Sequence, residues 1–420
     1  MVLEIRLSNF FSIKEEIILD FRAGNLNSEK ARSLQDNCFH FKKDKILKVA
    51  AIYGPNASGK SNIIEAIRFC QALIFESHIH NADVTFNFRP FKFDHYPNKP
   101  STYFIRFVLN EVEYEYSFSL TQEKILKESL FYYPNGRRAK IFARDEKKGQ
   151  TKKEKYSFSP SVVRRPMVVA ESTSEKNLFL SRASQMDRAL PKEIYQFFHR
   201  KFIRDYSSYT ISHIEQMVKK YKQSLLGALQ FADSDIVDIK LKRYQTPPPQ
   251  LLTVEILTGK RLLPDIDNLE IKTYHKSHPE VAFDFMTEES QGTQHFFFMM
   301  LNILEILEHD KFLLIDEIED SLHPGIVEYI IKIFHAGAKA QLLFSTHNTN
   351  LLDLSLFRKD QIWFVNKIED GSSDLYSLYD YSDFRETMDL EKAYLQGRFD
   401  AIPIINDSAY SLKSILDEER

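Results

Sequence analysis

One eight-residue segment restricts what this chain can fold into more than any other part of the sequence. Residues 54–61 read Gly-Pro-Asn-Ala-Ser-Gly-Lys-Ser and match the pattern G-x-x-x-x-G-K-[ST] in full. They follow the apolar run 47–53 and precede residues 62–69, whose apolar side chains have helical spacing. A strand, a glycine-rich loop and a helix in this order predict a nucleoside triphosphate site on an α/β fold.

The loop offers several contacts to a triphosphate. Its backbone N–H groups can surround the phosphates, and the ammonium group of Lys60 can reach the terminal ones. The hydroxyl group of Ser61 can ligate Mg²⁺ at the N-terminus of the next helix. The residues expected to bind the nucleotide are Gly54, Asn56, Ser58, Gly59, Lys60, Ser61 and Asn62, with Ser61 also a metal ligand.

Length and composition are those of an ordinary globular protein. The 420 residues allow a main domain with an inserted or appended part. Cys38 and Cys70 are the only cysteines, too few for a disulfide framework, which predicts a cytoplasmic protein. We expect neither a signal peptide nor a membrane span, since no segment reaches the roughly 20 apolar residues of a membrane helix. The net charge of -3 leaves nucleic-acid binding open, and the basic run 147–153 is better explained as a solvated hairpin tip.

The pattern of apolar residues predicts how the chain is organised. Two short strands at 3–7 and 17–21 are expected beside the strand that precedes the phosphate loop. Strand-like runs with alternating aromatic residues, separated by turns, predict a β-meander whose aromatic side chains form core rather than a base-stacking platform. These runs are 102–109, 112–120, 125–133 and 140–144.

The middle of the chain changes to helical spacing. Between about 175 and 233 the apolar residues recur every three or four positions, which predicts a helical arm or lid. The Pro-rich segment 246–250 is expected to be an extended linker before a returning strand at 251–257. We therefore divide the chain into 1–175, 176–245 and 246–420. The apolar face of the expected arm contains Ile214, Met217, Val218, Tyr221, Leu225 and Leu226.

A second group of polar residues lies in the C-terminal part of the chain. The apolar run 312–315 describes a buried strand, and it ends in Asp316, which can hold Mg²⁺, and Glu317, which can polarise the attacking water. Residues 289–294 offer a serine, a glycine and a helix N-terminus, and residues 341–348 form another apolar run that ends in Ser-Thr-His. Each segment alone has an ordinary structural explanation, but their order favours an active site.

With these motifs in this order, the chain resembles the ABC-type ATPases of the SMC, RecF and OLD group over residues 1–75 and about 280–370. By this resemblance 54–61 is the Walker A loop, Ser290 to Gln294 the signature motif, and Asp316 with the catalytic Glu317 the Walker B motif. Asp320 corresponds to the D-loop residue and His347 to the switch histidine, which contacts the γ-phosphate.

The resemblance implies both a fold and an assembly. The expected fold is an ABC-type P-loop NTPase head with a β-meander subdomain and an inserted helical arm. The expected assembly is a homodimer, or a higher oligomer built from it, that holds two ATP molecules with Mg²⁺ between its heads. Ser290 and Gly292 would then bind the γ-phosphate of the ATP held by the other subunit.

The chain also departs from the pattern of this group. The signature reads Ser-Gln-Gly-Thr-Gln instead of Ser-Gly-Gly-Gln, and Gln71 comes too early for a Q-loop glutamine. Slow hydrolysis, or a metal geometry completed differently, is therefore compatible with the sequence. The middle is too short for the long rods of SMC proteins, and the part after His347 is too short for the TOPRIM domain of OLD nucleases.

The C-terminal stretch resembles that of one subgroup of these ATPases. Residues 384–403 are similar to those of stand-alone bacterial AAA15-type ATPases, often encoded next to an effector in anti-phage systems. A helix at 389–396, stopped by Gly397, is expected to dock on the head and to expose 397–399 for a partner. The leading hypothesis is an ATPase that controls a separate nuclease or toxin. The alternatives are a RecF-like DNA clamp and a chain that is itself a nuclease or toxin.

Overall fold

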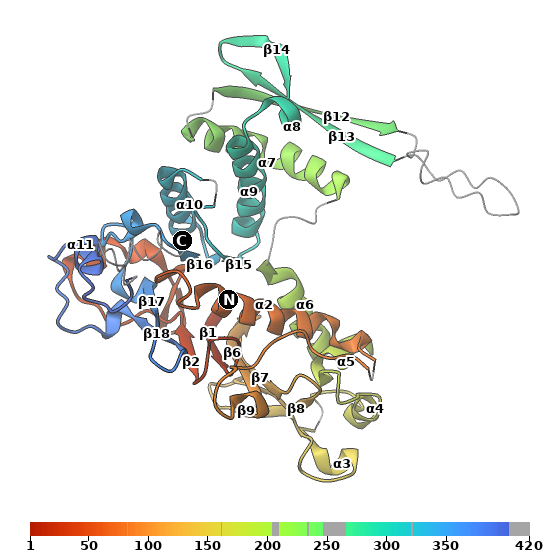
Figure 1. Cartoon of the computed structure of the whole chain (residues 1–420). Coiled ribbons are helices and arrows are strands. Elements are labelled where there is room, and N and C mark those ends of the chain that lie inside the picture. Colours follow the sequence, from red (N-terminus) through yellow and green to blue (C-terminus); the bar gives the residue numbers. More distant parts are fainter. Residues whose placement is uncertain are drawn as a thin grey trace, which may run out of the picture.

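The computed structural model describes residues 1–81, 83–160, 162–203, 210–232, 235–246, 266–320 and 322–402 (Figure 1). Its strands are β1 Val2–Ser8, β2 Ile17–Asp20, β3 Cys38–Phe41, β4 Asp44–Leu47, β5 Val49–Tyr53, β6 Ser101–Leu109, β7 Val112–Leu120, β8 Ile125–Tyr132, β9 Ala139–Asp145, β10 Tyr156–Phe158, β11 Phe202–Ile203, β12 Ile236–Thr246, β13 Ile266–His275, β14 His278–Asp284, β15 Phe312–Ile315, β16 Gln341–Thr346, β17 Ile362–Lys367 and β18 Ser373–Ser377. Its α-helices are α1 Glu29–Ser33, α2 Lys60–Glu76, α3 Lys152–Lys155, α4 Pro166–Glu171, α5 Phe179–Gln185, α6 Ala189–Lys201, α7 Ile211–Phe231, α8 Phe285–Glu288, α9 Gln291–Glu308, α10 Pro324–Ala336 and α11 Leu390–Leu395.

A six-stranded sheet carries the phosphate loop. Its order is β11-β15-β16-β5-β17-β18, and β15, β16, β5 and β17 run parallel to one another. Every residue of β5, β15 and β16 is buried, as expected for the inside of a parallel sheet. The predicted strands before the phosphate loop, before Asp316 and before His347 are therefore confirmed, and their carboxyl ends meet at one edge of this sheet.

A seven-stranded antiparallel sheet packs against this unit. Its order is β10-β9-β8-β7-β6-β1-β2, and β6 to β9 form the predicted meander. Tyr103, Phe107 and Tyr116 are buried in its core, so these aromatic residues are core, as predicted. Together the two sheets give the α/β fold expected of an ABC-type P-loop NTPase head.

The prediction that the first two strands lie beside the phosphate-loop strand is wrong. β1 pairs with β2 and with β6, for example Ile5 with Ile105, and belongs to the antiparallel sheet. Buried Leu3, Ile5 and Leu7 alternate with more polar positions in β1, and such alternation suits an antiparallel sheet with one solvated face. The antiparallel and parallel sheets meet where the backbone N–H of Val2 donates to the side chain of Gln341.

Two apolar cores cover the two faces of the parallel sheet. Ala50 and Ile52 of β5 face the core shared with α2, α5, α6 and the antiparallel sheet. Val49, Ala51 and Tyr53 face the core shared with α7, α9, α10 and α11. Since β5 is held from both sides, the loop at its end starts from a fixed position.

Helix α7, the sheet β12-β13-β14 and α8 stand above the two large sheets as an arm, with α9 leading down to the parallel sheet (Figure 1). The predicted apolar face of α7 is confirmed, because Met217, Val218, Leu225 and Leu226 are buried and Ile214 and Tyr221 pack against that core. The linker 247–250 and the returning segment 251–257 lie outside the described residues. No helix among the described residues is long and apolar enough to cross a membrane.

The C-terminal helix docks as predicted. Asp389 caps α11, and Gly397 ends it with a φ of 79°, a conformation that suits glycine. The expectation that Phe399 is exposed is wrong. Its ring is fully buried and stacks on Phe364 of β17 at a centroid distance of 4.9 Å. Burying this apolar ring against the parallel sheet is favourable, so Phe399 belongs to the core and is not exposed to a partner.

Candidate functional site

The two outer glycines of the phosphate loop have no room for a side chain. A Cβ on Gly54 would lie 2.3 Å from the carbonyl oxygen of Val365. Gly59 has a φ of 113°, and a Cβ there would lie 2.0 Å from the hydroxyl oxygen of Ser373. The loop can therefore hold this close-packed shape only with glycine at these positions, and α2 begins directly after Gly59 with its N–H groups directed at the loop.

The Lys60 side chain folds along the loop. Its ammonium group donates to the carbonyl oxygens of Gly54 at 2.8 Å and Pro55 at 3.1 Å. Burial lowers the pKa of Lys60 to about 8, although the carboxylates of Glu317 and Asp316 oppose this shift. At neutral pH the side chain is still mostly protonated and can serve as the cation for a phosphate group.

The two acidic residues after β15 are held by one serine of the neighbouring strand. The hydroxyl group of Ser345 donates to the carboxylate of Asp316 at 2.5 Å and accepts the backbone N–H of Glu317 at 2.8 Å. Glu317 has a φ of 52°, which turns the chain sharply after Asp316. The Glu317 side chain is 54% exposed, so its carboxylate can reach water.

His347 connects the acidic residues to the phosphate loop. Its Nδ1 lies 3.4 Å from the ammonium nitrogen of Lys60, and its Nε2 lies 3.8 Å from the carboxylate of Glu317. Burial and then the Lys60 charge lower the pKa of His347, so the ring is neutral at pH 7. Because an ammonium group can only donate, Nδ1 accepts and Nε2 carries the proton that faces Glu317.

Lys60, Glu317 and His347 line one pocket of about 460 Å³ at the carboxyl edge of the parallel sheet, whereas Gly54 and Asp316 are not among the described residues that line it. Ser58, also expected to bind the nucleotide, is buried within the loop and does not line the pocket. The Asn62 side chain lines it but donates to the hydroxyl group of Ser12 at 2.7 Å. The lining residues are Asn56, Ala57, Gly59, Lys60, Ser61, Asn62, Glu317 and His347.

The signature residues lie elsewhere. Ser290 caps α9, where its hydroxyl oxygen accepts the backbone N–H of Thr293 at 3.0 Å, and Gly292 is in the first turn of that helix. Neither residue is among the described residues that line the pocket. Asp320 lies in the loop after β15, and its backbone N–H donates to the carbonyl oxygen of Glu317. The phosphate loop, Glu317 and His347 thus come together within one chain, whereas Ser290 and Gly292 do not join them.

Four supporting residues were not singled out from the sequence. Ser345 lies inside the run 341–348 highlighted from the sequence, and Glu319 directly precedes Asp320. A Glu319 carboxylate oxygen accepts the backbone N–H of His347 at 2.5 Å. Ser12 and Ser373 have no motif of their own. The Ser373 hydroxyl donates to the carbonyl oxygen of Ser58 at 2.5 Å and accepts from the Ser12 hydroxyl at 2.7 Å, so these two serines support the loop.

Replacing Ser345 by alanine is expected to lower the rate of ATP turnover by about 10- to 100-fold, because a hydrogen bond to a charged group contributes about 1.5–3 kcal/mol. The affinity for ATP should change little, since the phosphate loop keeps its contacts. Steady-state hydrolysis and nucleotide titration measure the two quantities. The matched control is Ser129→Ala, which removes only a hydroxyl contact with Ser117 on the far side of the antiparallel sheet. Equal losses in both variants would contradict a positioning role for Ser345.

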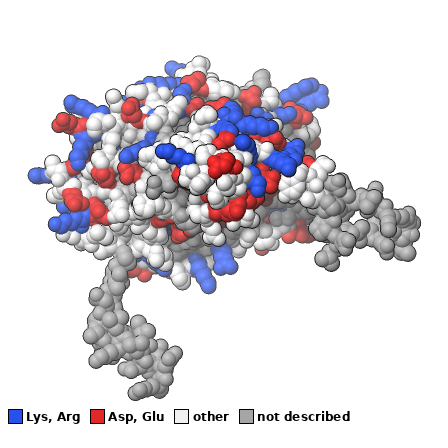
Figure 2. Space-filling model, turned by 90° about the horizontal axis from the view of Figure 1, so that it is seen from above, with Lys and Arg blue, Asp and Glu red and all other residues white. Residues whose placement is uncertain are grey.

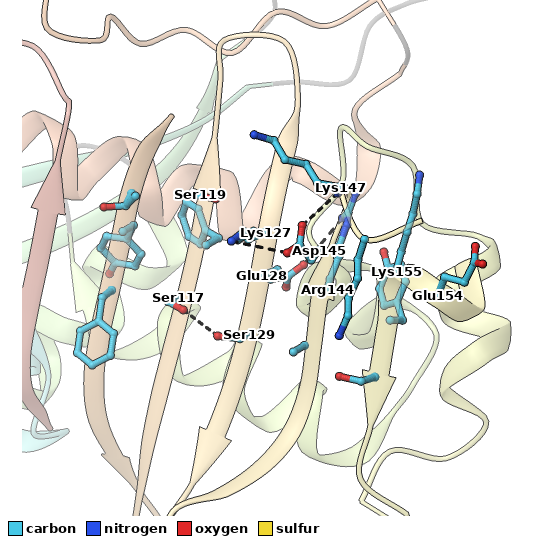
Figure 3. Close-up of a pocket in the computed structure, with 18 of the residues that line it drawn as sticks. Ser117, Ser119, Lys127, Glu128, Ser129, Arg144, Asp145, Lys147, Glu154 and Lys155 are labelled. Atoms are coloured by element: carbon cyan, nitrogen blue, oxygen red, sulfur yellow. Dashed lines mark hydrogen bonds and ion pairs between the residues drawn. The ribbon is translucent and has the colours of Figure 1, made fainter. Parts of the chain in front are cut away.

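The outer face of the meander carries a larger hollow of about 690 Å³ (Figure 3). Small hydroxyl side chains such as Ser117 and Ser129 form its floor. Several of its charged groups are paired within the sheet: Lys127 with Asp145 at 3.6 Å, and Lys155 with Glu146 at 2.8 Å. The basic run 147–153 lies in the connection between β9 and β10, as predicted. This hollow contains none of the residues that the motifs indicate.

Comparisons with known proteins indicate the family of this chain. A family model described as "AAA domain, putative AbiEii toxin, Type IV TA system" matches residues 49–353. None of the curated proteins gives a significant match to the sequence. Among solved structures, the chain is similar to the SMC head bound to the C-winged helix domain of ScpA, with 15% identity, a TM-score of 0.41, and coverage of 94% of this chain and 99% of that chain. It is also similar to the SMC head domain from Thermotoga maritima, with 14% identity, a TM-score of 0.40, and coverage of 90% and 98%. Because the matched region spans most of the chain and includes the phosphate loop, Glu317 and His347, this chain belongs to the AAA domain family of that description.

Proposed function

We propose that this protein binds and hydrolyses ATP, dimerises on ATP, and uses the closed and open states of the dimer to restrain or release a separate effector in bacterial defence against phage. The observation that carries this proposal is the meeting of Lys60, Glu317 and His347 at one pocket on the edge of the parallel sheet. A cation for phosphate, a carboxylate for water and a neutral histidine between them are the parts that phosphoryl transfer to water needs.

Each side chain has a task in this reaction. Lys60 and the loop N–H groups hold the terminal phosphates. The Glu317 carboxylate orients the attacking water and accepts its proton, and the 54% exposure of its side chain leaves room for that water. His347 donates from Nε2 to the γ-phosphate, because its Nδ1 is already occupied by Lys60.

The oxygen donors at the site suit Mg²⁺. The hydroxyl group of Ser61 and the carboxylate of Asp316 are hard ligands of the type this ion prefers. When bound, Mg²⁺ would neutralise charge on the β- and γ-phosphates. The Ser345 hydroxyl group fixes the rotamer of Asp316 and so positions the ligand that this chain contributes.

The position of the signature residues supports a dimer. Ser290 and Gly292 lie at an exposed helix N-terminus, which suits an anion, but they do not line the pocket of their own chain. In a homodimer they would complete the site of the partner, with Asp320 close to the same interface. Two ATP molecules would then be held between the subunits.

Two observations support a separate effector. The description of the family names a putative toxin of a type IV toxin–antitoxin system, which fits a chain that is itself the toxin as well as one that controls it; in either case such a system has two components. On the C-terminal side, Leu395 is 58% exposed and Met388 is 38% exposed, which offers apolar contacts to another protein. We infer that the partner is a nuclease or toxin that the ATPase holds inactive.

The surface gives less support to a RecF-like clamp on duplex DNA. The face in Figure 2, seen from above the arm, shows Lys and Arg intermixed with Asp and Glu among its described residues. A clamp must neutralise several phosphates and needs a largely basic track. We therefore retain the clamp only as an outcome that the experiment below can detect.

The experiment is light scattering of the purified protein with its genomic neighbour, with and without ATP and Mg²⁺. We expect the mass of the protein to double with ATP and the complex with the neighbour to change in size or to dissociate. Lys60→Ala should prevent both changes, whereas Lys332→Ala, at an exposed position on α10, should leave them intact. A protein that stays monomeric with ATP would contradict the dimer, and ATP-dependent, salt-sensitive DNA binding without a complex would favour the clamp.

A further inference from the structure

The arm is tied to the signature motif by a cluster of polar side chains, here called the Glu289 clamp, formed by Glu289, Thr273, His275 and Asp235. Glu289 directly precedes Ser290. We propose that Thr273 and His275 of the arm position the signature serine through Glu289, so that the orientation of the arm sets how well Ser290 serves the ATP of the partner subunit. This inference rests on the proposed function.

The groups of the clamp are closely spaced, and all except Asp235, whose side chain is 56% exposed, are largely buried. The Thr273 hydroxyl, fully buried on the central strand β13, donates to a carboxylate oxygen of Glu289. The Nε2 of His275, at the end of β13, lies 2.9 Å from the same oxygen. The Glu289 side chain is only 9% exposed, so water cannot easily replace these two bonds.

The histidine extends the clamp toward the neighbouring strand, because Ile236 at the start of β12 pairs with His275. Its Nδ1 lies 2.5 Å from the carboxylate of Asp235, which precedes β12 and follows α7. The Phe283 ring of β14 packs edge-on against the imidazole at a centroid distance of 4.6 Å. A residue of β14 and the residue that precedes β12 thus contact the side chain that holds Glu289.

The segment beyond Glu289 is rigid enough to pass on a displacement. The side-chain amide nitrogen (Nε2) of Gln294 donates to the backbone carbonyl oxygen of Glu289 at 2.9 Å, and Ser290 caps α9. Ser290 therefore sits between a side chain fixed to the arm and a helix fixed in the core. A tilt of the arm sheet would move Glu289 and, with it, the adjacent signature serine.

The first test compares two histidines of the same arm. His275→Ala should lower ATP turnover by about tenfold, which corresponds to the loss of a hydrogen bond to a charged group. Binding of ATP to the same chain should be unchanged, because the phosphate loop is untouched. His278→Ala, at a position whose side chain is 72% exposed, should behave like the wild type. Glu289→Gln keeps one acceptor oxygen but removes the charge that strengthens both bonds, so this second variant should show a smaller loss of the same kind.

The second test shows whether the loss acts across the dimer. A Lys60→Ala subunit binds no ATP but has an intact signature motif, so mixing it with His275→Ala should restore activity. The restored level should equal that of a mixture of Lys60→Ala with Ser290→Ala. A general destabilisation of the arm would not be rescued in this way.

The possible results separate the two proposals. Recovery only in the mixture that contains Ser290→Ala would overturn the positioning role of His275 while leaving the dimer in place. No recovery in either mixture would contradict a site formed by the phosphate loop of one subunit and the signature motif of the other. It would also contradict an effect of the Glu289 clamp across the dimer. Unchanged ATP turnover in both His275→Ala and Glu289→Gln would also refute the positioning role of the Glu289 clamp.

The clamp also has a pH signature. A histidine donates from both nitrogens only when protonated, and Asp235 and Glu289 are the charged groups that face this ring. Burial lowers the pKa of His275, but the bonds to the two carboxylates outweigh it, and the pKa is raised overall. The stabilisation is then fully present below about pH 6.5 and is lost as the pH rises through the raised value. The difference in unfolding temperature between the wild type and His275→Ala should shrink over that range, and a constant difference would contradict a protonated bridge.

Discussion

Replacing Glu317 by glutamine is expected to lower ATP turnover by about 10²–10⁴-fold, the contribution typical of a positioned general base. The amide keeps the size of the side chain but cannot accept a proton from water. Binding should persist, because the loop N–H groups and Lys60, whose ammonium already contacts the loop carbonyls, make the phosphate contacts. The ATP-bound dimer should therefore accumulate. Single-turnover hydrolysis and light scattering with ATP measure the two effects.

The matched control is Glu328→Gln on α10. Glu328 pairs with Lys332 on the surface and lies outside the pocket. The Glu328→Gln variant should therefore hydrolyse ATP at the rate of the wild type. An ATP-bound Glu317→Gln protein that remains monomeric would contradict ATP-dependent dimerisation. Turnover within a few-fold of the wild type would instead remove Glu317 from the role of base and leave the water to be activated by another group.

Replacing Arg144 by methionine is expected to destabilise the antiparallel sheet by about 3–5 kcal/mol, the usual result of removing one partner from a buried ion pair. The guanidinium is fully buried 4.0 Å from the carboxylate of Glu128 (Figure 3). It also lies 2.7 Å from the carboxylate of Glu146 and donates to the carbonyl oxygens of Ser174 and Asn177. Without it, the buried carboxylate of Glu128 loses its cationic partner and the two carbonyl oxygens lose a donor.

Glu128 shows why this pair matters for the fold. Its carboxylate accepts the backbone N–H groups of Phe179 and Leu180 at 2.6 Å and 3.0 Å, which fixes the start of α5 on the sheet. Burial raises the pKa of Glu128, although Arg144 opposes this shift. In Arg144→Met the carboxyl group would take up a proton more readily, and its hold on the two N–H groups would weaken.

Hydrogen exchange of the β8 and β9 amides measures this effect, because a chain of this size can unfold in more than one step. The control is Arg138→Met, whose guanidinium is 51% exposed and pairs with Glu115 on the same sheet. An exposed pair contributes about 1 kcal/mol or less, so the control should keep most of its protection. Equal loss of protection in both variants would show that the buried pair stabilises the sheet no more than the exposed pair does.

The sequence by itself determined the parts of this protein that depend on neighbouring residues. The phosphate loop at 54–61, the strand that ends in Asp316 and the strand before His347 are each contiguous patterns. Apolar runs and glycines fix their local conformation without reference to the rest of the chain. The same holds for the meander, the apolar face of α7 and the helix that ends at Gly397.

Only the tertiary structure decided which distant residues meet. Ser345 holds Asp316 because β16 lies beside β15, and Ser373 donates to the carbonyl oxygen of Ser58 because β18 returns near the loop. The placement of β1 in the antiparallel sheet, the burial of Phe399 and the clamp at Glu289 follow in the same way from strand order and packing. Such contacts join side chains far apart in the chain, and a serine or histidine carries no local signal of the partner it will find once the sheets have formed.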